Sequence, residues 1–203
     1  MASISTQGCG MQMKVVLKYI TPNTESFIGE MAAICYNGLI DKSANIRRAA
    51  KCADDGHLST LRFANAVFGI YNISRVCSHQ LVRSKHLDFL QRSQRYCKEE
   101  LDIEDFTIPN VANSYQKDCI IIHNEACNNL YNSLLKDGWK KEDARFVLPE
   151  ATHTDMNVTG NLQAWMDFIK LRTHKAAQWE IREVATQINN ILARECPHLF
   201  KEM

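Results

Sequence analysis

The pattern of apolar and polar positions divides this chain of 203 residues into strand-like and helix-like segments. Residues 13–20, MKVVLKYI, and residues 66–74, AVFGIYNIS, are rich in β-branched and aromatic side chains, and each segment predicts a strand. The Thr-rich segment 151–160, ATHTDMNVTG, ends at a glycine and predicts a further strand or hairpin arm. A sheet is therefore one part of the expected fold.

Apolar residues that recur at every third or fourth position predict helices over much of the remaining chain. The clearest helix runs from Asn113 to Leu135 and ends at Asp137-Gly138. Further helices are expected after a Thr24 cap and over residues 44–53, 74–83, 140–146, 161–172 and 176–194. The apolar stripe of the long helix consists of Tyr115, Cys119, Ile122, Ala126, Leu130 and Leu134.

The same pattern contains no repeat, linker or low-complexity stretch. It predicts one α+β domain over residues 13–203, behind a flexible tail at residues 1–12. Because no apolar run reaches the roughly 20 residues of a bilayer span, and the N-terminus lacks a secretory signal, we expect no membrane partner.

Charge and cysteine usage exclude several classes of protein. The net charge is +1, so the chain as a whole is not an electrostatic partner for nucleic acid. The eight cysteines contain no CxxC pair, and the histidines show no metal-binding spacing, so we expect no metal site. We expect instead free, mostly buried thiols in a reducing cytoplasm.

The segment 80–96, QLVRSKHLDFLQRSQRY, gathers basic and amide side chains. Arginine forks suit a phosphate group, and Gln and Arg suit the donor and acceptor edge of a pyrimidine ring. Gln80, Arg83, Ser93, Gln94 and Arg95 have this chemistry. A solvated charged surface is the other interpretation that composition leaves open. DNA binding would need many more phosphate contacts.

This segment resembles the signature of the flavin-dependent thymidylate synthases, the ThyX family, which reads Q-x-x-R-H-R-x-x-S-x-N-E-x-S-x-R-Y. Gln80, Arg83, Ser93, Arg95 and Tyr96 stand at the same spacing without a gap. GHLSTL at 56–61 resembles the family segment G-H-x-S-P-x-E-H. ARFVLP at 144–149 and NLQAWMDFIKLRTHKAAQWEI at 161–181 are also similar to family segments, in the same order. Four ordered segments between Met13 and the C-terminus make the resemblance specific.

The resemblance implies a ThyX-like catalytic domain, with a central mixed or antiparallel sheet flanked by helices and a long helical portion. It implies methylation of dUMP to dTMP with methylenetetrahydrofolate as carbon donor, FAD as hydride source and NADPH as the reductant of FAD. It also implies a homotetramer with shared active sites and no cysteine nucleophile.

The resemblance further assigns roles to individual positions. Arg172 would contact the uracil edge and stabilise charge as the ring is activated. The positions implied to bind dUMP are Gln80, Arg83, Gln91, Ser93, Gln94, Arg95, Arg145 and Arg172. The positions implied to contact FAD are Ser59, Arg83, Ser84, Lys85, Gln91, Asn161, Gln163 and Asp167.

Departures from the family pattern gather at the flavin positions. Because fewer cationic donors would face the FAD pyrophosphate, these departures predict weaker FAD binding. The nucleotide positions are mostly intact. The departing residues are Ser84, Lys85, Asp88, Leu90, Gln91, Gln163, Asp167 and Ala176.

Two alternatives to an ordinary thymidylate synthase therefore stay open. One is a folate-dependent dUMP or dCMP hydroxymethylase, in which the methylene group attached at C5 is hydrated instead of reduced. The other is a non-catalytic nucleotide-binding homologue. The presence of Arg172 argues against the non-catalytic homologue, because mere binding has less need of a uracil activator.

Overall fold

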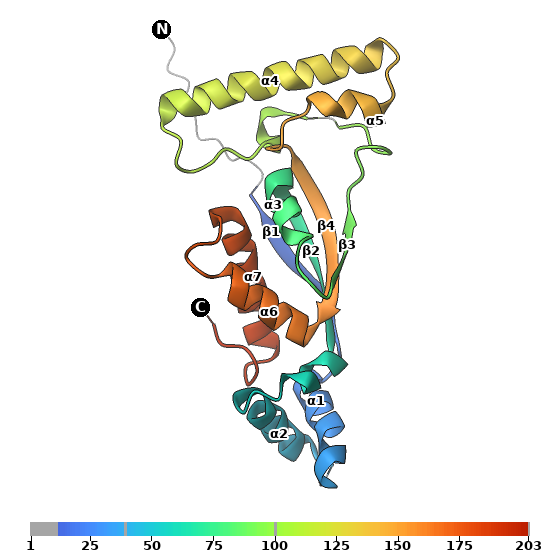
Figure 1. Ribbon diagram of the computed structural model, residues 1–203, viewed down its shortest axis with the longest axis vertical. Helices are drawn as coiled ribbons and strands as arrows, with labels where there is room; N and C mark the ends of the chain where they lie inside the picture. Colours follow the sequence, from blue (N-terminus) through green and yellow to red (C-terminus); the bar gives the residue numbers. More distant parts are fainter. Residues whose placement is uncertain (1–11, 39, 100, 203) are drawn as a thin grey trace. The chain divides into compact units, whose positions relative to one another are not determined.

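The computed structural model describes residues 12–38, 40–99 and 101–202 (Figure 1). The predicted tail at 1–12 lies outside this part of the chain except for Gln12. Within it, one antiparallel sheet has the strand order β1-β2-β4-β3. The strands are β1 (Lys14–Ile20), β2 (Asn65–Ser74), β3 (Leu87–Gln91) and β4 (His153–Asn161). The predicted α+β class is confirmed.

Helices account for most of the remaining described residues, and each helix predicted from the sequence is present. None of the described helices combines the length and hydropathy that a membrane span requires. The α-helices are α1 (Thr24–Ala33), α2 (Lys42–Asp54), α3 (Arg75–Leu81), α4 (Ser114–Lys136), α5 (Lys141–Ala144), α6 (Leu162–Arg172) and α7 (Trp179–Glu195). The 3₁₀ turns are η1 (Ile34–Tyr36), η2 (Leu58–Phe63), η3 (Ile103–Asp105) and η4 (Arg145–Val147).

Two local details differ from the expectation. Strand β3 lies inside the basic segment and was not predicted, because its five residues, LDFLQ, include the charged Asp88 and are too few to show a period. Thr24 is the first residue of α1 and not its cap. The capping position is Asn23, which adopts the left-handed conformation at φ 50° and accepts no hydrogen bond through its side chain.

The chain forms two compact units, which are described separately. The first unit contains residues 71–79 and 91–155 together with the chain up to Lys14. The second unit contains residues 15–70 and 80–90 and the chain from Met156 onward. Residues 80–96, the basic segment of the sequence, therefore contribute to both units.

Trp165 of α6 organises the core of the second unit. Its side chain is fully buried, and its indole N–H donates to the Ala66 carbonyl of β2 at 3.1 Å. The rings of Phe68 and Phe168 lie edge-on to it, with centroids 4.9 and 5.9 Å away. Such pairs add about 0.5–1.5 kcal/mol beyond the burial of their area. The indole therefore attaches α6 to β2.

Helix α7 of the second unit follows the predicted helical period. Its apolar residues at every third or fourth position are buried, among them Ile181, Ile188 and Leu192. On the same helix, Gln187 Oε1 accepts a hydrogen bond from the Val15 backbone N–H of β1 at 3.2 Å. The helix is thereby connected to strand β1.

Helix α4 of the first unit differs from the usual amphipathic pattern. Its buried residues are Asn124 and Tyr131, whereas the predicted apolar stripe is largely exposed. Tyr115 is 76% exposed, Ile122 is 65% exposed and Leu130 is 49% exposed. The spacing of apolar residues correctly predicted the helix. In the described structure of one chain, however, the apolar stripe does not pack against the core.

The cysteines are free thiols in the described residues, but they are not mostly buried. Cys52, Cys77 and Cys196 are buried, and burial raises the pKa of Cys196 to about 12. The exposed or half-buried thiols are Cys35, Cys97, Cys119 and Cys127. The expectation was wrong partly because Cys119 and Cys127 lie on α4, whose surface is open.

Candidate functional site

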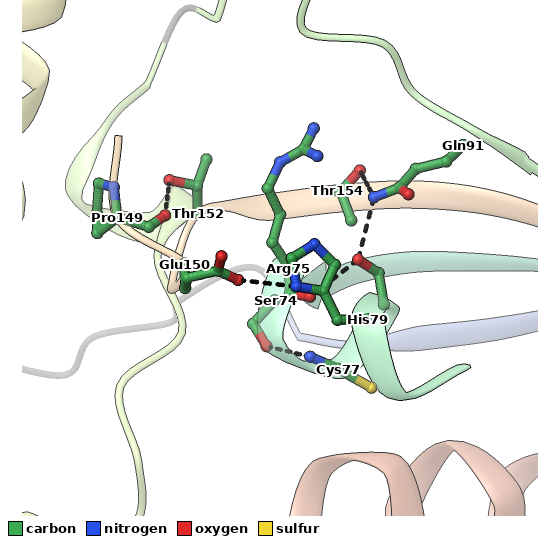
Figure 2. A network of polar contacts seen from close by, with 10 residues as sticks. Ser74, Arg75, Cys77, His79, Gln91, Pro149, Glu150, Thr152 and Thr154 are labelled. Atoms are coloured by element: carbon green, nitrogen blue, oxygen red, sulfur yellow. Dashed lines mark hydrogen bonds and ion pairs between the residues drawn. The ribbon is translucent and has the colours of Figure 1, made fainter. Parts of the chain in front are cut away.

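Gln91, at the end of β3, is the centre of a polar network in the first unit (Figure 2). Its side-chain amide donates to Ser78 Oγ at 3.1 Å and to Thr154 Oγ1 at 3.2 Å. The Ser78 hydroxyl donates to the Arg75 carbonyl at 2.9 Å, so its oxygen can accept from Gln91. The signature quoted above has a glutamate at this position, and an ionised carboxylate has no proton to donate to either hydroxyl. The amide at this position therefore fits its surroundings.

Beyond β3, the chain turns at Ser93. The backbone N–H groups of Tyr96 and Cys97 donate to the Ser93 carbonyl at 3.3 and 2.9 Å, and the Arg95 N–H donates to Ser93 Oγ at 3.3 Å. The turn leaves Arg95 exposed, where its Nε lies 2.6 Å from Glu142 Oε2. Its guanidinium carbon also lies 5.5 Å from the centre of the Tyr96 ring.

Glu99 is a fully buried carboxylate beside this turn. Burial raises the pKa of the Glu99 carboxyl above its ordinary value, and the positive charges of Arg92 and Arg75 oppose that shift. Arg92 Nη2 lies 3.1 Å from Glu99 Oε2, and the Glu99 backbone N–H donates to the Tyr131 hydroxyl at 3.2 Å. These contacts connect the turn to α4.

Cationic donors gather around this carboxylate. Arg75, which the sequence reading missed, has a buried Nε without a hydrogen-bond partner among the described atoms. Burial lowers the pKa of Arg75, Glu99 raises it, and the charge of Arg145 is close enough to lower it again. The side chain of buried Gln94 hydrogen-bonds the Glu99 carboxylate and lowers the pKa of that carboxyl. Because buried donors normally have partners, this group is suited to an anion.

Arg145 belongs to the same unit. Its Nε donates to the Glu142 carbonyl at 3.1 Å, within the short turn where α5 passes into η4. Glu142 therefore contacts two of the predicted nucleotide residues. Its backbone carbonyl contacts Arg145, and its carboxylate contacts Arg95. Nothing in the sequence distinguished Glu142, because its role depends on Arg95, which lies 47 positions away in the chain.

In the second unit, the structure brings two predicted nucleotide residues together. Arg172, at the end of α6, donates through Nη2 to the Gln80 carbonyl at 3.0 Å. Its Nε is buried and has no partner among the described atoms. The bond to Gln80 orients the guanidinium, while Nε can still donate to a ligand.

Arg62 and Gln163 form a contact of the second unit that the sequence reading missed. Arg62 Nε donates to Gln163 Oε1 at 2.6 Å. In the family segment G-H-x-S-P-x-E-H the acidic residue falls on Arg62, and the resemblance implies that Gln163 stands in place of a family arginine. A guanidinium is therefore still present at this contact, but η2 supplies it and not α6.

The other predicted flavin positions of the second unit have different surroundings. Asn161 caps α6, since its Oδ1 accepts from the Ala164 N–H at 2.9 Å. Ser84 has a buried hydroxyl without a partner among the described atoms. The exposed members are Ser59, Arg83, Lys85 and Asp167.

The comparisons with known proteins identify the family. The sequence profile of the Thy1 family, the thymidylate synthase complementing proteins, matches residues 15–198. The chain belongs to this family. The matched range contains every position at which a nucleotide or flavin contact is predicted, and the resemblance found in the sequence is confirmed.

Relatives of this Thy1 chain bear the name flavin-dependent thymidylate synthase. The one from Geobacter sulfurreducens is 34% identical over 200 residues, covering 94% of this chain and 86% of the relative. The one from Pyrococcus abyssi is 41% identical over 146 residues, covering 68% of this chain and 59% of the relative. The match thus spans about three-fifths of the archaeal protein's length.

A solved structure has the same fold as this Thy1 chain. It is thymidylate synthase X from Helicobacter pylori, crystallised with FAD and dUMP. The two superpose with a TM-score of 0.76 at 21% identity, covering 94% of this chain and 98% of the other. At this identity the likeness establishes the fold.

The buried Glu99 carboxylate generates a pH-dependent prediction. A carboxyl whose pKa is raised on folding stabilises the native state fully below its unfolded pKa, and this contribution is lost as the pH rises through the folded pKa. We therefore expect E99Q to gain free energy of unfolding relative to the unsubstituted chain as the pH rises from 4 toward neutrality. Urea denaturation across that range measures the difference. The exposed α4 variant E125Q should show no such trend, and a constant difference for E99Q would contradict the assignment.

Proposed function

We propose that this chain is a flavin-dependent thymidylate synthase that methylates dUMP at C5. The observation that carries the proposal is the pair of buried arginine donors without acceptors, Arg172 Nε at a family nucleotide position in the second unit and Arg75 Nε in the first. A nucleotide offers phosphate and carbonyl oxygens, which are the acceptors that these groups need. The relatives named flavin-dependent thymidylate synthase support the same reaction.

The chain's own residues can bind dUMP and polarise its ring. Ser93, Gln94, Arg95 and Arg145 would hold the phosphate and sugar, and Arg75 adds a buried cation to this group. Arg172, oriented by the Gln80 carbonyl, would hydrogen-bond the uracil edge and stabilise the negative charge that develops there. These roles require no covalent bond to the protein.

FAD fits the second unit better than the sequence alone predicted. Arg62 lies beside Gln163, so a cation remains where the family arginine is missing. The buried Ser84 hydroxyl without a partner supplies a further donor. Both groups suit the oxygens of FAD. When bound and reduced, FAD would supply the hydride that converts the one-carbon unit to a methyl group.

Methylenetetrahydrofolate as carbon donor, NADPH as reductant of FAD and a homotetramer with shared sites complete the proposal. The exposed stripe of α4 supports self-association, because Tyr115, Ile122 and Leu130 form an apolar row that a second copy of the chain can cover. No described contact specifically favours the hydroxymethylase or the non-catalytic homologue.

The nucleotide site can be tested with Arg172→Ala. Loss of a charge-assisted hydrogen bond should weaken dUMP binding about tenfold or more, measured by calorimetry. Arg182→Ala is a matched control, because Arg182 also donates to a backbone carbonyl, that of Lys175 at 3.1 Å, but lies outside the proposed site. Equal dUMP affinity in the two variants would remove Arg172 from the site.

The reaction itself is decided by the mass of the product. The purified protein is incubated with dUMP, methylenetetrahydrofolate, FAD and NADPH, and the nucleotide is then weighed by mass spectrometry. A methylated product supports the proposal, a hydroxymethylated product indicates a dUMP hydroxymethylase, and unchanged dUMP overturns the proposal.

The position of the Arg62 guanidinium beside Gln163 predicts how charge substitutions at these two residues change FAD affinity. Arg62→Glu should weaken FAD binding about tenfold, because a carboxylate would stand beside Gln163 and face the ligand's phosphates. Combining R62E with Q163R recreates the family arrangement and should restore most of the affinity. Titration of the apoprotein with FAD, followed by flavin fluorescence, measures both. If R62E binds FAD as tightly as the unsubstituted chain, Arg62 does not contribute to the FAD site.

The apolar stripe predicts a role for Ile122 in assembly. Ile122→Glu should produce a smaller oligomer in multi-angle light scattering, because a charge placed in an apolar contact must be desolvated. Ile40→Glu is the matched control, since Ile40 is also 65% exposed and lies outside α4. An unchanged mass for I122E would place the interface elsewhere.

A further inference from the structure

A hollow of about 660 Å³ lies in the first unit, between the segment that follows the Ser93 turn and the end of α4. It is lined by Arg95 and Tyr96 from the turn, by Lys136 from the last turn of α4 and by Trp139 and Lys140 from the connection to α5. We call it the basic hollow. It extends beyond the residues to which a nucleotide role is assigned.

The backbone that ends α4 shapes this hollow. Gly138 has φ 88°, a left-handed conformation that glycine adopts without strain. Its N–H donates to the Leu135 carbonyl at 3.1 Å, and the Trp139 N–H donates to the Leu134 carbonyl at 3.0 Å. These bonds complete the helix end and place Trp139 at the hollow, next to Lys140.

The charge of the hollow is strongly positive. Arg95, Lys98, Lys136, Lys140 and Lys141 line it, against the single carboxylate of Glu142. That carboxylate pairs with Arg95, and Lys141 Nζ donates to the Tyr96 carbonyl at 2.8 Å. Lys136 and Lys140 have no carboxylate partner among the described residues. The excess of cations therefore remains available to an anionic ligand.

Aromatic surface accompanies this charge. Trp139 is 53% exposed and Tyr96 is 72% exposed, and both line the hollow together with Leu135. Flat apolar faces beside ammonium groups suit a ligand that carries an aromatic ring next to several negative charges.

We propose that the basic hollow binds the benzoyl-glutamate tail of the folate substrate, with an affinity that rises as γ-linked glutamates are added. This inference rests on the proposed function, which makes a folate the carbon donor. The benzoyl ring matches Trp139 and Tyr96, and the successive carboxylates match the lysines. Arg95 lines the hollow and is also a predicted nucleotide residue, so the tail would lie next to dUMP.

A single-stranded nucleic acid is the other polyanion with aromatic groups. It binds through a long positive groove and many phosphate contacts, whereas this hollow is local and the chain has a net charge of only +1. The clustered lysines and the limited extent of the hollow favour a short oligocarboxylate.

The experiment measures binding of p-aminobenzoyl-glutamate probes with one, three and five glutamates to the full chain, by calorimetry with dUMP present at saturation. These probes lack the pterin and cannot react, so the result does not depend on catalysis. Affinity should rise with tail length at low salt. In the double variant K136Q/K140Q, affinity for the longest probe should fall about fivefold or more, and the rise with length should disappear.

The matched control is K42Q/K117Q, which removes two exposed lysines outside the hollow and should keep the dependence on length. Affinity that is independent of length in the unsubstituted chain overturns the proposal, as does the absence of probe binding to the dUMP-saturated protein. Oligothymidylate binding that K136Q/K140Q abolishes, without any glutamate dependence, would assign the hollow to nucleic acid. Turnover with monoglutamyl folate tests the proposed function separately.

Discussion

The two hydrogen bonds donated by Gln91 attach the end of β3 to its neighbours just before the Ser93 turn. One goes to Ser78 of α3 and the other to Thr154 of β4, so a single amide connects three elements of the first unit. The residues that follow, from Ser93 to Arg95, take their positions from that connection. A partly buried amide between two hydroxyls satisfies its donors locally, which makes this arrangement specific.

The nucleotide side of the site combines satisfied and unsatisfied polar groups. Arg172 is oriented by the Gln80 carbonyl and Arg95 by Glu142, whereas Arg75 Nε and Arg172 Nε are buried without partners among the described atoms. Such donors carry a desolvation cost in the free protein that an anionic ligand can offset. A preorganised binding site requires side chains that protein partners already orient. It also requires hydrogen-bond donors that are still available to the ligand.

The flavin side illustrates how chemistry can persist while the residue at a given position changes. A comparison of single positions counts Gln163 as the loss of an arginine. Arg62 of η2 donates to Gln163, so in the proposed FAD site it would supply a guanidinium from another element. Charge in a binding site depends on where groups meet in space, so substitutions at one position are interpreted together with those at its neighbours.

Much of this protein could be read from its sequence. The period of apolar residues identified α4, α6 and α7, and the ordered motifs identified the family, because both signals are local in the chain. Strand β3 could not be read in this way, since five residues with a charge among them carry no clear period. The exposure of the apolar stripe of α4 could not be predicted either. A helical period shows which residues share a face but not what covers that face.

The sequence by itself determined the family, the α+β class and the candidate residues for nucleotide and flavin. The tertiary structure alone decided which of these residues meet and which are left with unused donors. Gln80 and Arg172 are separated by 92 positions, and Arg62 and Gln163 by 101. Only folding brings such groups within hydrogen-bonding distance, because a hydrogen bond requires atoms about 3 Å apart, whatever their separation along the chain.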